Sequence, residues 1–165
     1  CSKRRQRMGD DWMNDSDART VAAVRRVLVR DLGTLAGELR AYPSDEAVWR
    51  TAGAIANPAG TLALHLCGNL RHFVGATLGG TGYVRDRDAE FSRRGVPRAE
   101  LLAEIDAALR EVDGTLARLK DANLAGEYPL PLNGEPIGTT HFMVHLAAHL
   151  AYHLGQVNYH RRLIG

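Results

Sequence analysis

The chain has 165 residues, of which 45% are hydrophobic and 24% charged, a composition typical of one globular domain. Its 21 lysines and arginines nearly balance its 19 aspartates and glutamates, so we expect no extended basic surface for nucleic acid or acidic lipid. No apolar stretch approaches the roughly 20 residues of a membrane-spanning helix, and the N-terminus lacks the apolar segment of a signal peptide. The sequence therefore predicts a cytoplasmic protein that binds neither nucleic acid nor membrane.

The N-terminal segment differs in character from the rest of the chain. It begins at Cys1, and the basic residues that precede Met8 are typical of a solvated tail. We therefore expect a flexible tail over residues 1–18 and a single domain over residues 19–165. The two cysteines are too few for a disulfide framework, and Cys67 falls in an apolar helical pattern, so a reducing compartment is expected.

Apolar spacing predicts the first two long helices. Over residues 20–40 apolar side chains recur at steps of three and four, which is typical of an amphipathic helix. These residues are Val21, Val24, Leu28, Leu32, Leu35 and Leu39. Ser44 is a suitable N-cap for a short helix that ends at Trp49, and Pro58 opens a second long helix that ends near Leu78.

Two more long helices follow a polar segment. Residues 83–97 are too polar and aperiodic for a core element, so a long surface loop is expected there. Pro97 begins the third helix, and prolines with an Asn133-Gly134 pair predict a crossing connection with a small hairpin turn over residues 122–138. Thr139 or Thr140 would then cap a fourth helix. The sequence thus predicts an all-α protein, an antiparallel four-helix bundle.

Histidines are concentrated in the last predicted helix, and four of them are spaced by four residues. The five histidines of this helix are His141, His145, His149, His153 and His160. Each step of four residues drifts by about 40° around a helix, so the four evenly spaced side chains cover an arc. Because the remaining circumference is largely apolar, we expect this arc to face the interior or a cleft.

Histidines one turn apart can bind the same metal ion, so this pattern predicts a metal site. Spacing alone leaves three pairs open, namely 141/145, 145/149 and 149/153. A third ligand would come from the second long helix, where His65, Asn69 and His72 share one face. His72, His141 and His160 are each better explained as ordinary core histidines.

The segment from His149 to Gln156 resembles the HxxxHxGQ signature of the DinB-like (DinB/YfiT-like) superfamily. The resemblance extends over residues 20–164 in helix number, helix order and the long connection before the last helix. It implies a bundle with up-down-down-up connectivity, frequent homodimers, and a divalent metal held by His65, His149 and His153. His145, Asn69 and Gln156 would then be neighbours of the site.

Three imidazoles leave coordination positions open, which is typical of a catalytic metal site. Characterised members of the superfamily that this chain resembles include thiol-dependent S-transferases and isomerases. The resemblance therefore implies a metal-dependent enzyme that transfers a thiol to an electrophilic small molecule, or that hydrolyses such a molecule. Zinc or nickel is expected first, and iron, manganese or copper are alternatives. A low-molecular-weight thiol would be the second cofactor, and the sequence assigns no further catalytic residue.

The sequence leaves three further interpretations open. Arg85 and Arg87 are candidates for binding carboxylates of a substrate or thiol cofactor, although a solvated, internally ion-paired loop is the better explanation for them. The metal site could instead be structural or sensory in a non-enzymatic stress-response protein. The histidines could also form a metal-free, pH-sensitive dimer interface.

Overall fold

The computed structural model describes residues 2–119, 124 and 126–164, and for residues 2–17 it describes the backbone alone. The helical elements, in chain order, are α1 (Ser2–Arg40), α2 (Asp45–Trp49), α3 (Ala59–Leu70), the π-helix η1 (Arg71–Ala76), α4 (Arg87–Ser92), α5 (Arg98–Arg118) and α7 (Thr139–Ile164). Within this part of the chain there are isolated β-bridges but no strand. The all-α class predicted from the sequence is confirmed.

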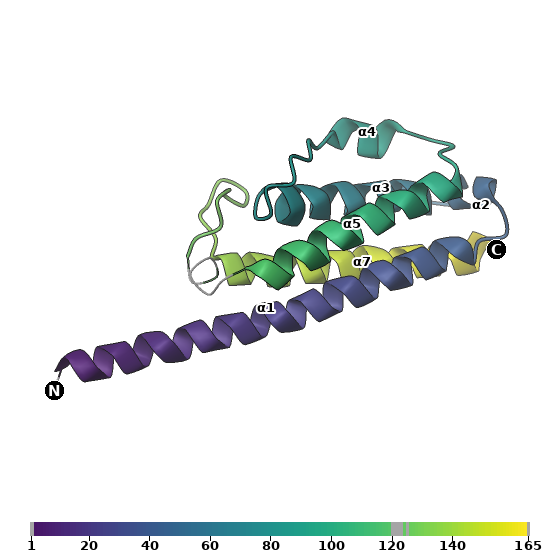
Figure 1. The fold of residues 1–165 in the computed structure, drawn as a ribbon. Coiled ribbons are helices and arrows are strands. Elements are labelled where there is room, and N and C mark those ends of the chain that lie inside the picture. Colours follow the sequence, from purple (N-terminus) through teal and green to yellow (C-terminus); the bar gives the residue numbers. More distant parts are fainter. Residues whose placement is uncertain (1, 120–123, 125, 165) are drawn as a thin grey trace.

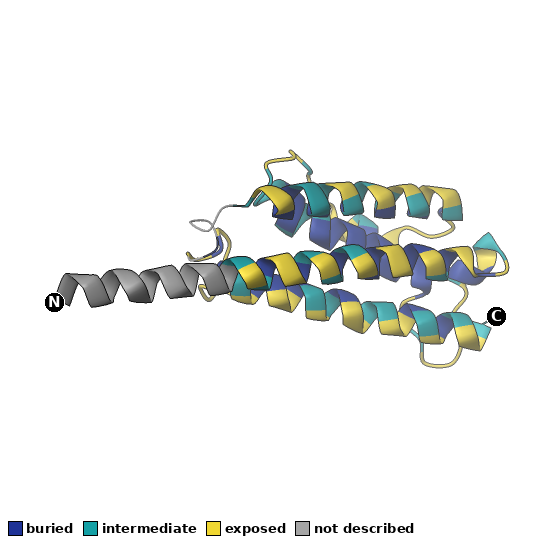
Figure 2. Cartoon of the chain, turned by 60° about the horizontal axis from the view of Figure 1, so that its bottom comes forward, coloured by how far each residue is buried: buried dark blue, intermediate teal, exposed yellow. Residues whose placement is uncertain are grey.

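The long helices pack around a shared apolar core. Helix α1 packs against α5 and α7, and α3 packs against the same two helices. In Figure 1, α3 and α5 run in one direction, while α1 and α7 run in the other. Along α1, α5 and α7 the described residues include both buried and exposed positions, with the buried ones directed inward (Figure 2), whereas every residue of α3 is buried. Burial of one large aliphatic side chain contributes about 1.5–3 kcal/mol, so this core accounts for the packing of the helices.

Helix α1 confirms the spacing argument but is longer than expected. All six apolar residues of its predicted stripe are buried. The helix begins at Ser2, whereas the sequence pattern predicted a start at Thr20. The division of the chain into a tail over residues 1–18 and a domain over 19–165 stays a prediction.

The short helix α2 and the following long helix begin where the sequence predicted. The Ser44 side chain accepts a hydrogen bond from the backbone N–H of Ala47 and so caps α2. Helix α3 begins immediately after Pro58 and continues directly into η1. Cys67 is a free, buried thiol of α3 whose pKa is raised by burial, so it acts as a small apolar side chain.

The prediction of a surface loop over residues 83–97 was wrong in part. The segment contains helix α4, whose N-cap Asp86 accepts a hydrogen bond from the backbone N–H of Ala89. Glu90 of this helix is only 5% exposed. A carboxylate can be buried there because Arg85 and His65 are its partners, which polarity and periodicity alone did not indicate.

The described part of the connection before α7 contains the predicted hairpin turn. Leu132 and Glu135 exchange backbone hydrogen bonds across the turn, and both Asn133 and Gly134 have positive φ, as a type I′ turn requires. Residues 120–123 and 125 of the predicted connection lie outside the described part of the chain. The Thr139 and Thr140 hydroxyls donate to carbonyls of Gly126 and Leu124, so they tie α7 to the connection.

Candidate metal centre

Three histidines converge where α3 packs against α7. His65, His149 and His153 each offer one ligand atom, and these atoms all lie within 4.8 Å of one another. Their rings are nearly perpendicular in pairs, with interplanar angles of 83°, 89° and 88°. The Nε2 atoms of His65 and His149 are 3.2 Å apart. The nitrogens of the three rings therefore face a common point.

Helix geometry explains why these three meet. His149 and His153 are one turn apart, so both project from the same side of α7. His65 lies on α3, which packs against α7 and brings its ring to 5.1 Å and 5.4 Å from the other two ring centroids. Two of the three histidines thus come from one helix, and the third lies on another helix, 84 residues before His149 in the chain.

A hydrogen bond to Glu90 fixes the ring of His65. Its Nδ1 donates to the Glu90 carboxylate over 3.0 Å. Arg85 binds the same carboxylate through Nε and Nη2, at 2.7 Å and 2.8 Å. Burial alone would raise the pKa of Glu90, but the hydrogen bonds from Arg85 and His65 lower it below its ordinary value. Because Nδ1 of His65 carries the proton, its Nε2 lone pair is free for a metal ion.

The two histidines of α7 are also suited to bind a cation. Nδ1 of His153 donates to the Gln156 amide oxygen over 2.6 Å, which leaves Nε2 of His153 free. Burial, followed by the nearby His153, His65, His145 and Arg85, lowers the pKa of His149 to about 4. Burial also lowers the pKa of His153. Both rings are therefore neutral near pH 7, the form that ligates metals.

The donor set fits a divalent ion. Nε2 of His65 directs a lone pair toward Nε2 of His149, and such convergent lone pairs are favourable when a cation accepts both. The buried Nδ1 of His149 has no hydrogen-bond partner among the described residues. Three imidazoles, two of them oriented by hydrogen bonds, could hold zinc, nickel or another divalent metal.

Only part of the predicted histidine arc faces the interior, contrary to expectation. His141 and His145 are exposed, and the His145 ring stacks on Phe142 at 5.8 Å between centroids. The reason is the drift of about 40° for each step of four residues, which turns the first two side chains away from α3. His145 still neighbours the site, since its ring centroid lies 6.3 Å from that of His149.

The structure explains His160 and His72 as ordinary packed histidines. His160 is buried, with Nε2 donating to the Arg50 carbonyl over 2.8 Å and Nδ1 accepting from the Tyr42 hydroxyl over 2.7 Å. His72 is half-buried, and its ring lies 4.7 Å from that of Phe73. Neither belongs to the cluster that could hold a metal.

The remaining predicted neighbours differ in position. Asn69 is buried one turn after His65, and its Oδ1 lacks a hydrogen-bond partner among the described residues. Arg85 is tied to Glu90, whereas Arg87 is exposed with its guanidinium 5.2 Å from the Phe91 ring centroid. Arg85 is therefore engaged beside the histidine cluster, whereas Arg87 lies at the surface.

Sequence reasoning missed Glu90. Asp86, three residues before Ala89, is an N-cap signal that could have predicted α4. No sequence spacing, however, connects Glu90 with His65, because the contact depends on how residues 79–97 cross over α3 (Figure 1).

Comparison with known protein families shows which family this chain belongs to. The family model of the DinB superfamily matches residues 13–157. The chain belongs to the DinB superfamily. All three clustered histidines of this DinB-superfamily protein lie in the matched range, and the resemblance inferred from residues 149–156 is confirmed. No curated protein matches the chain. In the described part of the chain, no helix combines the length and apolar character needed to cross a membrane.

Proposed function

We propose that this DinB-superfamily protein is a metal-dependent enzyme acting on an electrophilic small molecule. His65, His149 and His153 are the proposed ligands of a divalent ion, zinc or nickel first. The observation that carries the proposal is the convergence of three imidazoles, whose candidate ligand atoms lie within 4.8 Å of one another, beside a cavity that opens to solvent. A structural zinc site usually has four protein ligands, whereas three leave a position for an exogenous molecule.

A low-molecular-weight thiol is the proposed co-substrate. A divalent ion held in this way lowers the pKa of a thiol or water that it binds, so that a nucleophile forms near neutral pH. In the transfer, a sulfur–carbon bond forms as the bond from that carbon to its leaving group breaks. The leaving group departs with the electron pair, and the thiol proton passes to solvent. Hydrolysis would follow the same scheme with water in place of the thiol.

The residues of this chain have distinct parts in the proposed reaction. Glu90 fixes the ring of His65, and Gln156 fixes the ring of His153, so both ligands are oriented before anything binds. Arg85 neutralises the buried Glu90 carboxylate. Fixed ligand rings reduce the reorganisation that the reaction would otherwise require.

The finer architecture and the assembly are part of the same proposal. We infer that the long helices form the up-down-down-up bundle of the resemblance, in accord with their directions in Figure 1. We also infer a cytoplasmic homodimer that packs through the exposed face of α7 carrying Val144, Ala148 and Ala151, where small side chains permit close helix contact. The molar mass of the protein, compared with that of an Ala151→Arg variant, tests the dimer.

The proposed activity is tested with metal-loaded protein. The protein, loaded with zinc or with nickel, is incubated with cysteine or glutathione and a panel of alkyl and aryl halides, epoxides and esters. The products are followed by mass spectrometry. We expect metal-dependent thioether or hydrolysis products that are lost in His149→Ala and kept in His145→Ala, whose side chain lies outside the cluster. Products formed equally by His149→Ala, or absent from the metal-loaded protein, would contradict the proposal.

A further inference from the structure

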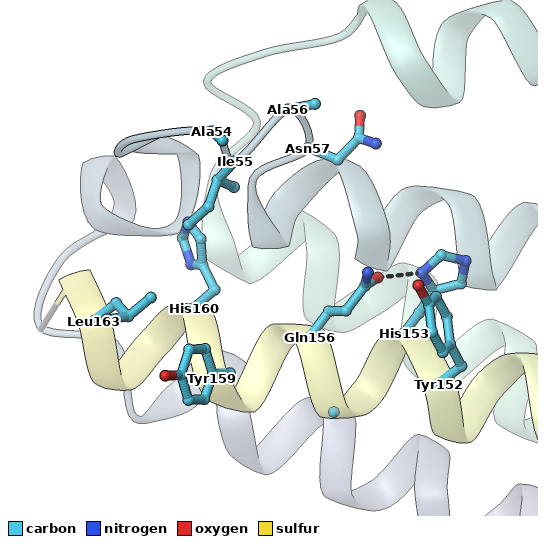
Figure 3. Close-up of a pocket in the computed structure, with 11 residues that line it drawn as sticks. Ala54, Ile55, Ala56, Asn57, Tyr152, His153, Gln156, Tyr159, His160 and Leu163 are labelled. Carbon is cyan, nitrogen blue, oxygen red and sulfur yellow. Dashed lines mark hydrogen bonds between the residues drawn. The ribbon is translucent and has the colours of Figure 1, made fainter.

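A cavity of about 780 Å³ lies between residues 54–57 and the C-terminal half of α7. Figure 3 shows the side chains of α7 along one side and the segment carrying Ile55 and Asn57 along the other. Pockets that hold small molecules typically have volumes of about 300–1,000 Å³. The cavity is therefore of the size that a small organic substrate needs.

The cavity borders the candidate metal centre through one shared residue. His153 belongs to the metal-binding cluster and also lines the cavity. Gln156, which accepts the hydrogen bond from Nδ1 of His153, lines the cavity as well. A molecule bound there would lie against one of the three proposed ligands.

The lining of the cavity is chiefly apolar. Ile55, Tyr159 and Leu163 contribute to its walls, and among the described lining residues none is aspartate, glutamate, lysine or arginine. Tyr159 is 66% exposed and Leu163 is 58% exposed. Large apolar side chains gathered on a surface and rimming a hollow are typical of ligand-binding sites. His153 and Gln156 supply polar groups at one end of the cavity, and His160 and Tyr159 supply polar groups toward the other end (Figure 3).

We propose that this cavity binds the apolar, uncharged body of the electrophilic substrate and directs its polar reactive group toward His153 and Gln156. This inference rests on the proposed function, because it assigns a substrate class to the same metal centre. A charged, carboxylate-rich thiol would find no cationic partner among the described lining residues. The cavity thus selects for the electrophile, with an aromatic or branched aliphatic group facing Ile55 and Tyr159.

Two hydroxamic acids with the same metal-binding group test this assignment. The protein is loaded with Co²⁺, and benzohydroxamic acid and acetohydroxamic acid are titrated while the visible absorption of the cobalt is recorded. Burial of a phenyl ring favours benzohydroxamic acid, and we expect it to bind at least about tenfold more tightly than acetohydroxamic acid. The readout is a binding constant and needs no turnover.

Variants distinguish the cavity from general hydrophobic attraction. Ile55→Glu places a charge in the wall, and Tyr159→Ser removes a ring that is 66% exposed. We expect both to reduce the ratio of the two binding constants several-fold. Leu130→Glu, in the connection before α7 and outside the cavity, is the matched control and should leave the ratio unchanged.

The outcomes separate this inference from the proposed function. Equal binding of the two acids, or a preference that survives both cavity variants, would overturn the cavity assignment while leaving an open metal site intact. If Co²⁺ binds but neither acid changes its absorption, the open site itself fails, and the cavity assignment fails with it. A change of molar mass in Ile55→Glu without a change in the ratio would assign this face to a second copy of the chain and overturn the inference.

Discussion

Glu90 accepts a 3.0 Å hydrogen bond from Nδ1 of His65, although the two residues belong to different helices and only Glu90 lies in the segment that crosses over α3. The contact settles which nitrogen of His65 is protonated and how its ring is turned. The crossover segment is therefore part of the candidate metal centre, because it supplies the group that orients a proposed ligand.

Replacement of this carboxylate should weaken metal binding. In Glu90→Gln the charge that orients His65 is lost while the side-chain volume is kept, and such changes beside a ligand typically cost about 10–100-fold in affinity. Competition with a zinc indicator measures the affinity. Asp88→Asn, exposed on the same helix, is the control and should bind zinc as the parent protein does. Equal affinities for Glu90→Gln and the parent would show that Glu90 does not orient the ligand.

Gly68 leaves the space that Glu90 occupies. A Cβ at residue 68 would collide with Oε1 of Glu90 and would lie 2.7 Å from its Cδ. Gly68→Ala should therefore displace the carboxylate, lower the free energy of unfolding and weaken zinc binding, even though alanine favours helices. In Gly37→Ala of α1 the new Cβ meets nothing within 4 Å, so this control should stabilise the protein by about 0.5–1 kcal/mol. Urea denaturation of both variants measures the change in the free energy of unfolding, which should be negative for Gly68→Ala and positive for Gly37→Ala.

The buried Tyr42–His160 pair should contribute to stability without affecting the metal centre. Tyr42→Phe removes the donor to Nδ1 of His160 and leaves a buried acceptor unpaired, which costs about 1–3 kcal/mol. Tyr159→Phe removes an exposed hydroxyl and should change the free energy of unfolding by less than about 0.5 kcal/mol. Similar losses in the two variants would contradict the role assigned to the pair.

An ion pair between α1 and α7 should make stability depend on pH in the acid range. Burial alone would raise the pKa of Glu38, but hydrogen bonds from Arg161 and Asn158 lower it below its ordinary value of 4.5. Because the folded protein holds the carboxylate ionised, Glu38 stabilises it above pH 4.5 and this contribution is lost as pH falls through the lowered pKa. Glu38→Gln should flatten the decline in unfolding free energy below that pH. A decline as steep as that of the parent would argue against the pair, and Asp88→Asn serves as the control.

Sequence spacing predicted the features that depend on neighbours along one helix. The buried stripe of α1 and the shared face of His149 and His153 both follow from 3.6 residues per turn. The resemblance to the family identified His65 as the third candidate ligand, whereas spacing alone left His65, Asn69 and His72 as alternatives on one helix face. Glu90 and the exposure of His141 could not be predicted, since both depend on how separate helices pack and where a neighbouring helix covers the arc.

The metal content of the protein is the most direct test of the account. Untagged protein is incubated with zinc or nickel, dialysed, and analysed by inductively coupled plasma mass spectrometry beside His149→Ala and His145→Ala. The account predicts close to one divalent ion per chain in the parent protein and in His145→Ala, and a loss of that ion in His149→Ala. Protein that retains no metal after reconstitution, or a His149→Ala variant that retains as much as the parent, would contradict it.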